Sequence, residues 1–258
     1  MTISRNFLLR AAQIHRGAVA IMACGVLGIA LGADQPGEKD KPAGEPQKLS
    51  LFDGKSLDGW KKTPFGGEGE VKIEDGAIVM AFGASLTGIT STRKDLPTAD
   101  YELTYEAKRI GGYDFFAAAT FPVGKTHVTL VNGGWGGSVT GISSIDGSDA
   151  SENETGKYYE YKNDKWYKFR VRVTEVRIQT WTDDKPVIDV GIKGRRLGTR
   201  IETDSSKPLG FAAWETRNEL CVATYEVAQE RKTGFVDAAT VFHKAGSREE
   251  ALRRQYWV

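Results

Sequence analysis

Cysteine, histidine and unbalanced charge are all scarce in this chain. It contains two cysteines and three histidines among 258 residues, and its net charge is +1. We expect Cys24 to leave with a leader, so Cys221 would have no partner for an intramolecular disulfide and the core alone must stabilise the fold. Near neutrality predicts no nucleic-acid partner. Only His127 and His243 follow the leader, which argues against a histidine-rich metal site or a Ser-His-Asp triad.

A long hydrophobic run is also lacking. The apolar stretch at residues 17–31 is shorter than the roughly 20 residues that cross a bilayer. Arg5, Arg10 and Arg16 precede it and two small residues follow it, a pattern typical of a cleaved secretion signal over residues 1–33. Its removal takes away three arginines and no acidic residue, which changes the net charge from +1 to −2. We therefore expect an exported protein, periplasmic or extracellular, with no stable membrane span after cleavage.

Helical periodicity is missing from the middle of the chain. Residues 34–47 are rich in Pro, Gly, Lys and Glu and predict a flexible linker. From residue 48 to 228, short strand patterns follow one another between turn signals, which predicts one all-β domain with an antiparallel sandwich or barrel. Several strands are apolar on one side only, which favours two packed sheets. Residues 229–258 predict a tail in which a capping box at Ser247 starts a short C-terminal helix.

The strand patterns predict different degrees of burial. Tyr101–Lys108 alternates apolar and polar side chains and predicts a strand with one buried face. The nearly continuous apolar run from Phe115 to Phe121 predicts a central strand. Asp75-Gly76 predicts a hairpin turn of the primed type. Further strands are expected at 127–131, 167–173, 176–181, 187–190, 209–213 and 222–227, and the apolar stretch from Leu51 predicts a short first strand.

A glycine-rich loop around one tryptophan is the first candidate binding element. Asn132 is followed by four glycines that flank Trp135. Glycines let the backbone approach a ligand closely, and an indole ring packs well on the apolar face of a sugar. In the alternative interpretation, Trp135 folds back into the core and the glycines only form a tight bulge. The residues alone do not separate the two.

Two further groups of residues are candidates for binding. The loop at residues 146–155 is dense in oxygen ligands, so Asp149 and Glu152 could bind sugar hydroxyls or a Ca²⁺ ion, although a solvated acidic loop has the same composition. Trp214 and Glu215 follow an apolar strand, where loops gather, but a core tryptophan in a hairpin fits that pattern equally. The sequence identifies no certain cofactor.

Two segments carry a resemblance to a known family. The stretch Leu51–Trp60 resembles the opening of the 3-keto-disaccharide hydrolase family, and 165–181 resembles its later pair of tryptophan-containing strands. Asp183-Asp184 stands where that family has Asn-Gly. The resemblance covers about residues 49–227 and implies a concanavalin A-like jelly roll, so the expected fold is an antiparallel two-sheet jelly-roll sandwich with a short C-terminal helix.

The resemblance also implies site residues. The strand at Tyr101–Arg109 is similar to the family's Glu-containing strand, which implies catalytic roles for Glu106 and Arg109. The strand 126–130 contains His127 but no carboxylate, where the family has a Tyr-Glu-x-Gln strand. Without the resemblance, Glu106 also fits a solvated polar face.

Three functions remain open on this basis. For an exported hydrolase acting on 3-keto-glycosides, Glu106 is the candidate base, and Arg109 or His127 would stabilise an enolate or protonate the leaving group. A conventional glycosidase would need two carboxylates about 5–9 Å apart. A lectin-like carbohydrate-binding module would use Trp135, Trp214 and the acidic loop without an activated acid. A structural surface protein would need none of these roles.

Overall fold

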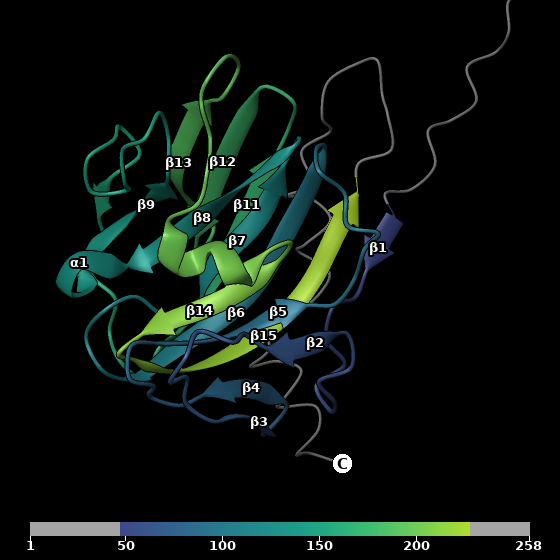
Figure 1. Cartoon of the computed structure of the whole chain (residues 1–258), viewed down its shortest axis with the longest axis vertical. Helices are drawn as coiled ribbons and strands as arrows, with labels where there is room; N and C mark the ends of the chain where they lie inside the picture. The colour runs from purple at the N-terminus through teal and green to yellow at the C-terminus, as the bar shows by residue number, and fades with distance from the viewer. Residues whose placement is uncertain (1–46, 228–258) are drawn as a thin grey trace, which may run out of the picture. The chain divides into compact units, whose positions relative to one another are not determined.

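The computed structural model describes residues 47–227, and the side chains of residues 48–220. Two antiparallel sheets make up this part of the chain (Figure 1). The eight-stranded sheet has the order β13 (Lys185–Gly191), β12 (Arg177–Thr182), β11 (Trp166–Val173), β6 (Tyr101–Gly111), β15 (Arg217–Val227), β4 (Ala77–Met80) and β3 (Val71–Glu74), and β1 (Gln47–Leu49) also pairs with β15.

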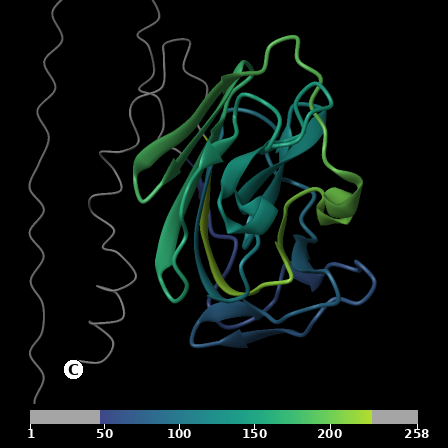
Figure 2. The same cartoon turned by 90° about the vertical axis from the view of Figure 1, so that its left-hand side faces the viewer.

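The second sheet has seven strands and carries two short helical turns. Its order is β10 (Lys157–Tyr158), β9 (Val139–Ser143), β8 (Thr126–Gly133), β7 (Ala118–Val123), β14 (Gly210–Trp214), β5 (Leu86–Ser91) and β2 (Trp60–Lys62). The helical turns are α1 (Gly134–Gly137) and the 3₁₀ helix η1 (Ile201–Ser206). Figure 2 shows the two layers side by side, with η1 outside the seven-stranded one. Among the described residues, no helix is long and apolar enough to cross a membrane.

The core lies between the two sheets. Tyr105 of β6 stacks on Phe169 of the same sheet and meets Phe211 of the other sheet edge to face, with ring centroids 5.0 and 4.9 Å apart. All three side chains are fully buried. Asn132 of β8 donates a hydrogen bond of 2.9 Å to the Tyr105 hydroxyl, so a polar contact also joins the sheets. The expected two-sheet jelly-roll sandwich is therefore confirmed.

Most of the expected strands are present, with shifted ends. The Asp75-Gly76 turn has φ angles of 47° and 72°, as a primed turn requires, and Asp183-Asp184 adopts the same left-handed region at 49° and 62°. The prediction of a strand from Leu51 was wrong: β1 ends at Leu49, and Leu51 is a buried residue outside any strand. Its carbonyl accepts a hydrogen bond from the Trp60 indole, which closes the turn between them.

The predicted central strand at Phe115 begins later than expected. Phe115 and Phe116 precede β7, which starts at Ala118, because Ala117 has a φ of 44° and breaks the extended run. The predicted leader, most of the linker and the C-terminal helix lie outside the described residues.

Candidate functional site

The candidate site is a pocket on the outer face of the seven-stranded sheet. Along β8, Val128 and Leu130 point into the core, whereas Thr129 and Val131 alternate with them and line the pocket. Its volume is about 200 Å³. That is below the roughly 300–1,000 Å³ of pockets for drug-sized ligands, so it fits a single small ring.

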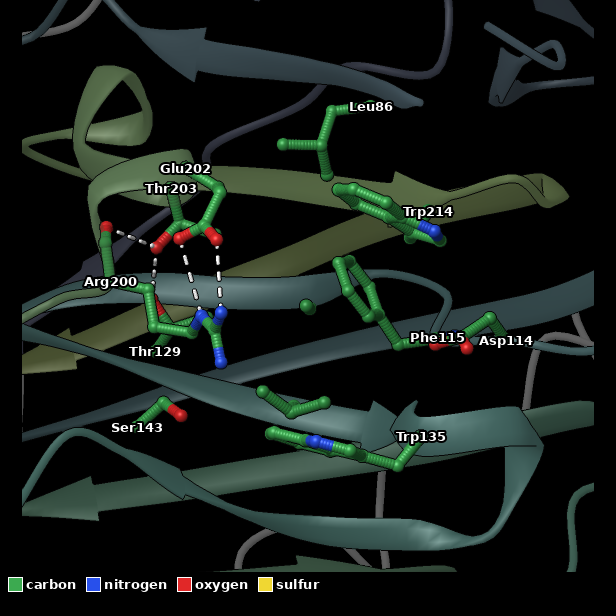
Figure 3. A pocket seen from close by; sticks show the side chains of 12 residues that line it. Leu86, Asp114, Phe115, Thr129, Trp135, Ser143, Arg200, Glu202, Thr203 and Trp214 are labelled. Carbon is green, nitrogen blue, oxygen red and sulfur yellow. Dashed lines mark hydrogen bonds and ion pairs between the residues drawn. The ribbon is translucent and has the colours of Figure 1, made fainter. Parts of the chain in front are cut away.

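Three aromatic side chains line the pocket. Figure 3 shows Trp135 on one side, Trp214 and Leu86 on the other, and Phe115 between them. The Phe115 and Trp214 rings are 6.4 Å apart and tilted by 45°. Trp135 is 42% exposed and so does not fold back into the core. The wall therefore presents flat apolar surfaces to a ligand, as a platform for the face of a sugar ring would.

The loop that carries Trp135 is held by Asp114. One carboxylate oxygen of Asp114 accepts a hydrogen bond of 2.7 Å from the Phe115 N–H, and the other accepts one of 3.0 Å from the Gly136 N–H. Trp135 itself has a φ of 51°. A Cβ on Gly137 would lie 2.3 Å from the Tyr113 carbonyl oxygen, so only glycine allows the loop to pack this closely. These contacts fix the indole at the pocket's edge.

An ion pair forms the other end of the pocket. Arg200 donates to both carboxylate oxygens of Glu202, from Nε at 3.2 Å and from Nη2 at 2.9 Å (Figure 3). Its Nη1 donates to Asp149. The hydrogen bonds from Arg200 lower the pKa of Glu202, and those to Glu202 raise the pKa of Arg200, so both are charged near neutral pH. Ser143 and Thr203 line this end as well.

Three predicted residues meet at this pocket. Trp135 and Trp214 line it, and Asp149 lies behind it as the second partner of Arg200. Asp149 also accepts a hydrogen bond of 3.3 Å from the Ser144 hydroxyl. The structure thus places Asp149 in a supporting position, whereas the two tryptophans face the pocket directly.

Glu106 lies on a different surface. In β6, Tyr105 and Ala107 point into the core, so Glu106 between them faces outward from the eight-stranded sheet. The pocket belongs to the outer face of the other sheet. Glu152 and Glu215 are exposed loop residues and do not line the pocket. The structure does not bring these three carboxylates together with the tryptophans.

Arg109 and Asn132 are buried behind the pocket. Arg109 donates to the Asn163 side chain at 2.7 Å, the Tyr161 carbonyl at 2.5 Å and the Asp114 carbonyl at 3.3 Å. Burial lowers its pKa. Asn132 is fully buried, and its amide also donates to the Ala117 carbonyl at 3.1 Å. Both residues hold backbone next to the pocket and do not line it.

His127 lines a second hollow on the same sheet face. It is part of β8, two residues before Thr129. Burial and the neighbouring Lys207 lower its pKa, and Asp204 opposes that effect. The structure separates His127 from the aromatic pocket and places it in basic surroundings.

The acidic loop is largely engaged with arginines. Arg195 pairs with Asp146 at 2.5 Å and with Glu154 at 2.6 Å, and Arg200 pairs with Asp149. Within the described residues, no group of three or more His, Cys, Asp or Glu side chains is arranged to hold a metal ion. Asp146, Asp149 and Glu154 of this loop therefore serve in ion pairs in this structure.

The sequence patterns did not identify several residues that line the pocket. Phe115 was assigned to a central strand, and Arg200, Glu202 and Leu86 were not singled out. The spacing of Arg200 and Glu202 is that of an ordinary surface ion pair, and only the 3₁₀ turn brings it over the sheet. Phe115, an aromatic residue directly after Asp114, was the one sequence feature that could have pointed to these missed residues.

Comparison with known proteins identifies one family. The sequence profile of the family described as the 3-keto-alpha-glucoside-1,2-lyase-like domain matches residues 47–220. No curated protein matches the chain.

Three solved structures have a similar fold. The carbohydrate-binding module CBM66 from Bacillus subtilis is 15% identical, with 65% of this chain and 95% of that chain covered and a TM-score of 0.41. The Crh5 transglycosylase in complex with NAG is 12% identical, with 73% and 86% covered and a TM-score of 0.49. The VIP36 exoplasmic/lumenal domain in its Ca²⁺/Man3GlcNAc-bound form is 15% identical, with 74% and 92% covered and a TM-score of 0.46. At these values the likeness concerns the fold alone.

Proposed function

The chain belongs to the 3-keto-alpha-glucoside-1,2-lyase-like domain family, and from that membership we propose that it cleaves 3-keto-glycosides in the aromatic pocket. The observation that carries the proposal is the pairing, in one pocket, of an aromatic platform with a charged Arg–Glu pair. The first suits the apolar face of a sugar ring, and the second offers a carboxylate base beside a cation for an elimination. The predicted leader over residues 1–33 makes export part of the same proposal.

The reaction follows from the acidity of a 3-keto sugar. The ketone at C3 acidifies the hydrogen at C2, so a base can remove that proton and leave an enolate. The enolate then forms the C1–C2 double bond while the C1–O bond breaks and its electron pair leaves with the glycosidic oxygen. The proton that the base took from C2 passes to that oxygen and completes the leaving group. Addition of water across the double bond gives the free 3-keto sugar, so elimination followed by hydration amounts to hydrolysis.

The pocket residues divide these tasks. Trp135 and Trp214 would hold the apolar face of the ring, and Glu202, ionised because its pKa is lowered, would accept the C2 proton. A carboxylate in an ion pair is a weak base, so the enolate must be stabilised as it forms. Arg200 has N–H groups beyond those it donates to Glu202 and Asp149, and these would stabilise the charge on the C3 oxygen.

A non-catalytic carbohydrate-binding module is the second candidate function. The observation that favours it is that both pocket carboxylates are already engaged by the protein. Asp114 accepts two backbone N–H groups, and Glu202 accepts two hydrogen bonds from Arg200. Such a site would bind a sugar on its aromatic wall without transferring a proton.

One experiment separates the two functions. The purified chain is incubated with a 3-keto-glucoside, and both the released alcohol and the 3-keto sugar are measured, with binding followed by calorimetry. We expect turnover, and we expect Glu202→Gln to lower it by about 100-fold or more while binding persists. Glu154→Gln is the matched control, since that carboxylate pairs with Arg195 outside the pocket.

The other outcomes are equally informative. Binding without turnover would support the binding module. The absence of both binding and turnover would exclude both functions. Glu106→Gln tests the location that the resemblance implies: if it abolishes turnover and Glu202→Gln does not, the reaction takes place on the eight-stranded sheet.

A further inference from the structure

A second hollow lies on the outer face of the seven-stranded sheet and has no role in the proposed reaction. Its volume is about 440 Å³. Five basic side chains line it, and no carboxylate does; we call it the basic groove. The five are Lys61, Arg93, Lys94, His127 and Lys207.

The charges around the basic groove are not balanced. Arg93 forms a two-point contact with Asp95, at 3.0 and 2.7 Å, and Lys207 pairs with Asp204. Lys61 and Lys94 are exposed, and no ion pair is present for either among the described residues. Four permanent cations therefore face two neighbouring carboxylates, which leaves a positive potential over the hollow.

His127 adds a group that responds to a bound anion. It is half-buried in the wall, and both burial and Lys207 disfavour its charged form, while Asp204 favours it. Lys61, Arg93 and Lys94 are the other charged groups that face the same hollow. A bound anion would offset their repulsion and favour the imidazolium, which then becomes a fifth cation.

One strand contributes residues to both the basic groove and the aromatic pocket, and η1 with the residue directly after it does the same. Val131 and Thr129 of β8 line the pocket, and His127 on the same face lines the groove. From His127 to Val131, four residues of strand span about 13 Å. Thr203 of η1 lines the pocket, and Lys207, directly after η1, lines the groove. The two hollows thus lie near each other on one sheet face, beside η1.

We propose that the basic groove binds an oxyanion group, a carboxylate or a sulfate, carried by a sugar unit next to the one held in the aromatic pocket. The placement of that first unit rests on the proposed function. The substrate class that follows is an acidic saccharide. The groove supplies attraction and orientation, because exposed lysines steer and retain an anion without a covalent step.

Calorimetry with two disaccharides tests this proposal. One contains a glucuronic acid unit and the other has glucose in its place, and each is titrated into the purified chain at low and high salt. We expect the acidic disaccharide to bind about tenfold more tightly at low salt, and the advantage to shrink as salt rises. The double variant Lys61→Ala/Lys94→Ala removes the advantage. Lys125→Ala, an exposed lysine that does not line the groove, keeps it.

The outcomes also separate this proposal from the proposed function. Equal affinity for the two disaccharides overturns the proposal, as does an advantage that the double variant retains. Binding of inorganic sulfate through Lys61 and Lys94, without any advantage for the acidic disaccharide, overturns the saccharide assignment. If the neutral disaccharide does not bind but the acidic one binds through these lysines, the aromatic pocket fails and the basic groove stands.

Discussion

Trp135 is the residue on which ligand binding should depend most. Its indole is 42% exposed and forms one wall of the pocket, so its removal takes away a stacking surface and no core contact. We expect Trp135→Ala to weaken sugar binding by about tenfold or more while the midpoint of thermal unfolding stays unchanged. Titration calorimetry and a thermal melt measure the two quantities.

The control for this prediction is another exposed aromatic residue. Tyr158 is 90% exposed on β10 and does not line the pocket, so Tyr158→Ala should change neither binding nor unfolding. Unchanged sugar affinity in Trp135→Ala would mean that the ligand binds elsewhere on the chain.

At the same scale, the sequence singled out Trp135 and Trp214 of the pocket wall but not Phe115, Arg200 or Glu202. Trp135 stood out because four glycines surround it, and Trp214 because it ends an apolar strand. Arg200 and Glu202 gave no such signal. Their positions depend on η1 lying over the sheet, where Thr203 contacts Thr129 at 3.3 Å, and this contact joins residues 74 positions apart. Local patterns carry no information about a contact at that separation.

At the scale of elements, the loop α1 decides whether Trp135 reaches the pocket. Gly136 and Gly137 both have positive φ, at 83° and 105°, but their surroundings differ. A Cβ at Gly137 would lie 2.3 Å from the Tyr113 carbonyl oxygen, whereas one at Gly136 meets nothing within 4 Å. Substitutions at the two positions therefore distinguish the cost of backbone strain from the cost of a steric collision.

We expect Gly136→Ala to cost about 1–2 kcal/mol of unfolding free energy, the cost of a side chain in the left-handed region, and to keep sugar binding. Gly137→Ala should cost more and should also weaken binding, because the loop must move away from Tyr113. Urea unfolding and calorimetry on both variants provide the measurement. Equal effects would show that the close approach at Gly137 is unimportant.

The strands were predictable where apolar and polar residues alternate in the sequence. β6 and β11 alternate apolar and polar residues, and both were expected. β5 was not expected, because its sequence LTGITS is buried throughout and has no alternation. Its outer side is covered by η1, where the Thr90 hydroxyl donates to the Ser205 carbonyl at 3.1 Å. Small polar residues fit such a covered face, but their pattern in the sequence does not predict a strand.

For the molecule as a whole, the contact between Asn132 and Tyr105 joins the two sheets inside the core. Asn132 was a candidate for ligand binding, but it is fully buried and donates to the Tyr105 hydroxyl and the Ala117 carbonyl. We expect Asn132→Ala to lower the unfolding free energy by roughly 1–3 kcal/mol, because buried partners lose their hydrogen bonds. Tyr105→Phe, which removes only one of the two acceptors, should cost less. Urea unfolding of both variants checks the order.

Acid should destabilise the whole molecule in two stages. The pKa of His127 is lowered from 6.5, mainly by burial, so the unfolded chain binds this proton more readily than the folded one. The pKa values of Glu202 and Asp204 are lowered from 4.5 and 3.8 by hydrogen bonds from Arg200 and Lys207 respectively. In every case the unfolded state takes up the proton first, so stability falls as the pH falls.

The unfolding free energy, measured in urea from pH 8 to pH 3, should therefore stay level down to about pH 6.5 and then decline as the unfolded-state imidazole takes up its proton. A second decline should begin below about pH 4.5, where the unfolded carboxyl groups become protonated. His127→Gln removes the contribution of the one described histidine, so it should flatten the first decline and leave the second. A first decline that persists at full size in His127→Gln would assign it to other groups and would mean that His127 titrates alike in both states.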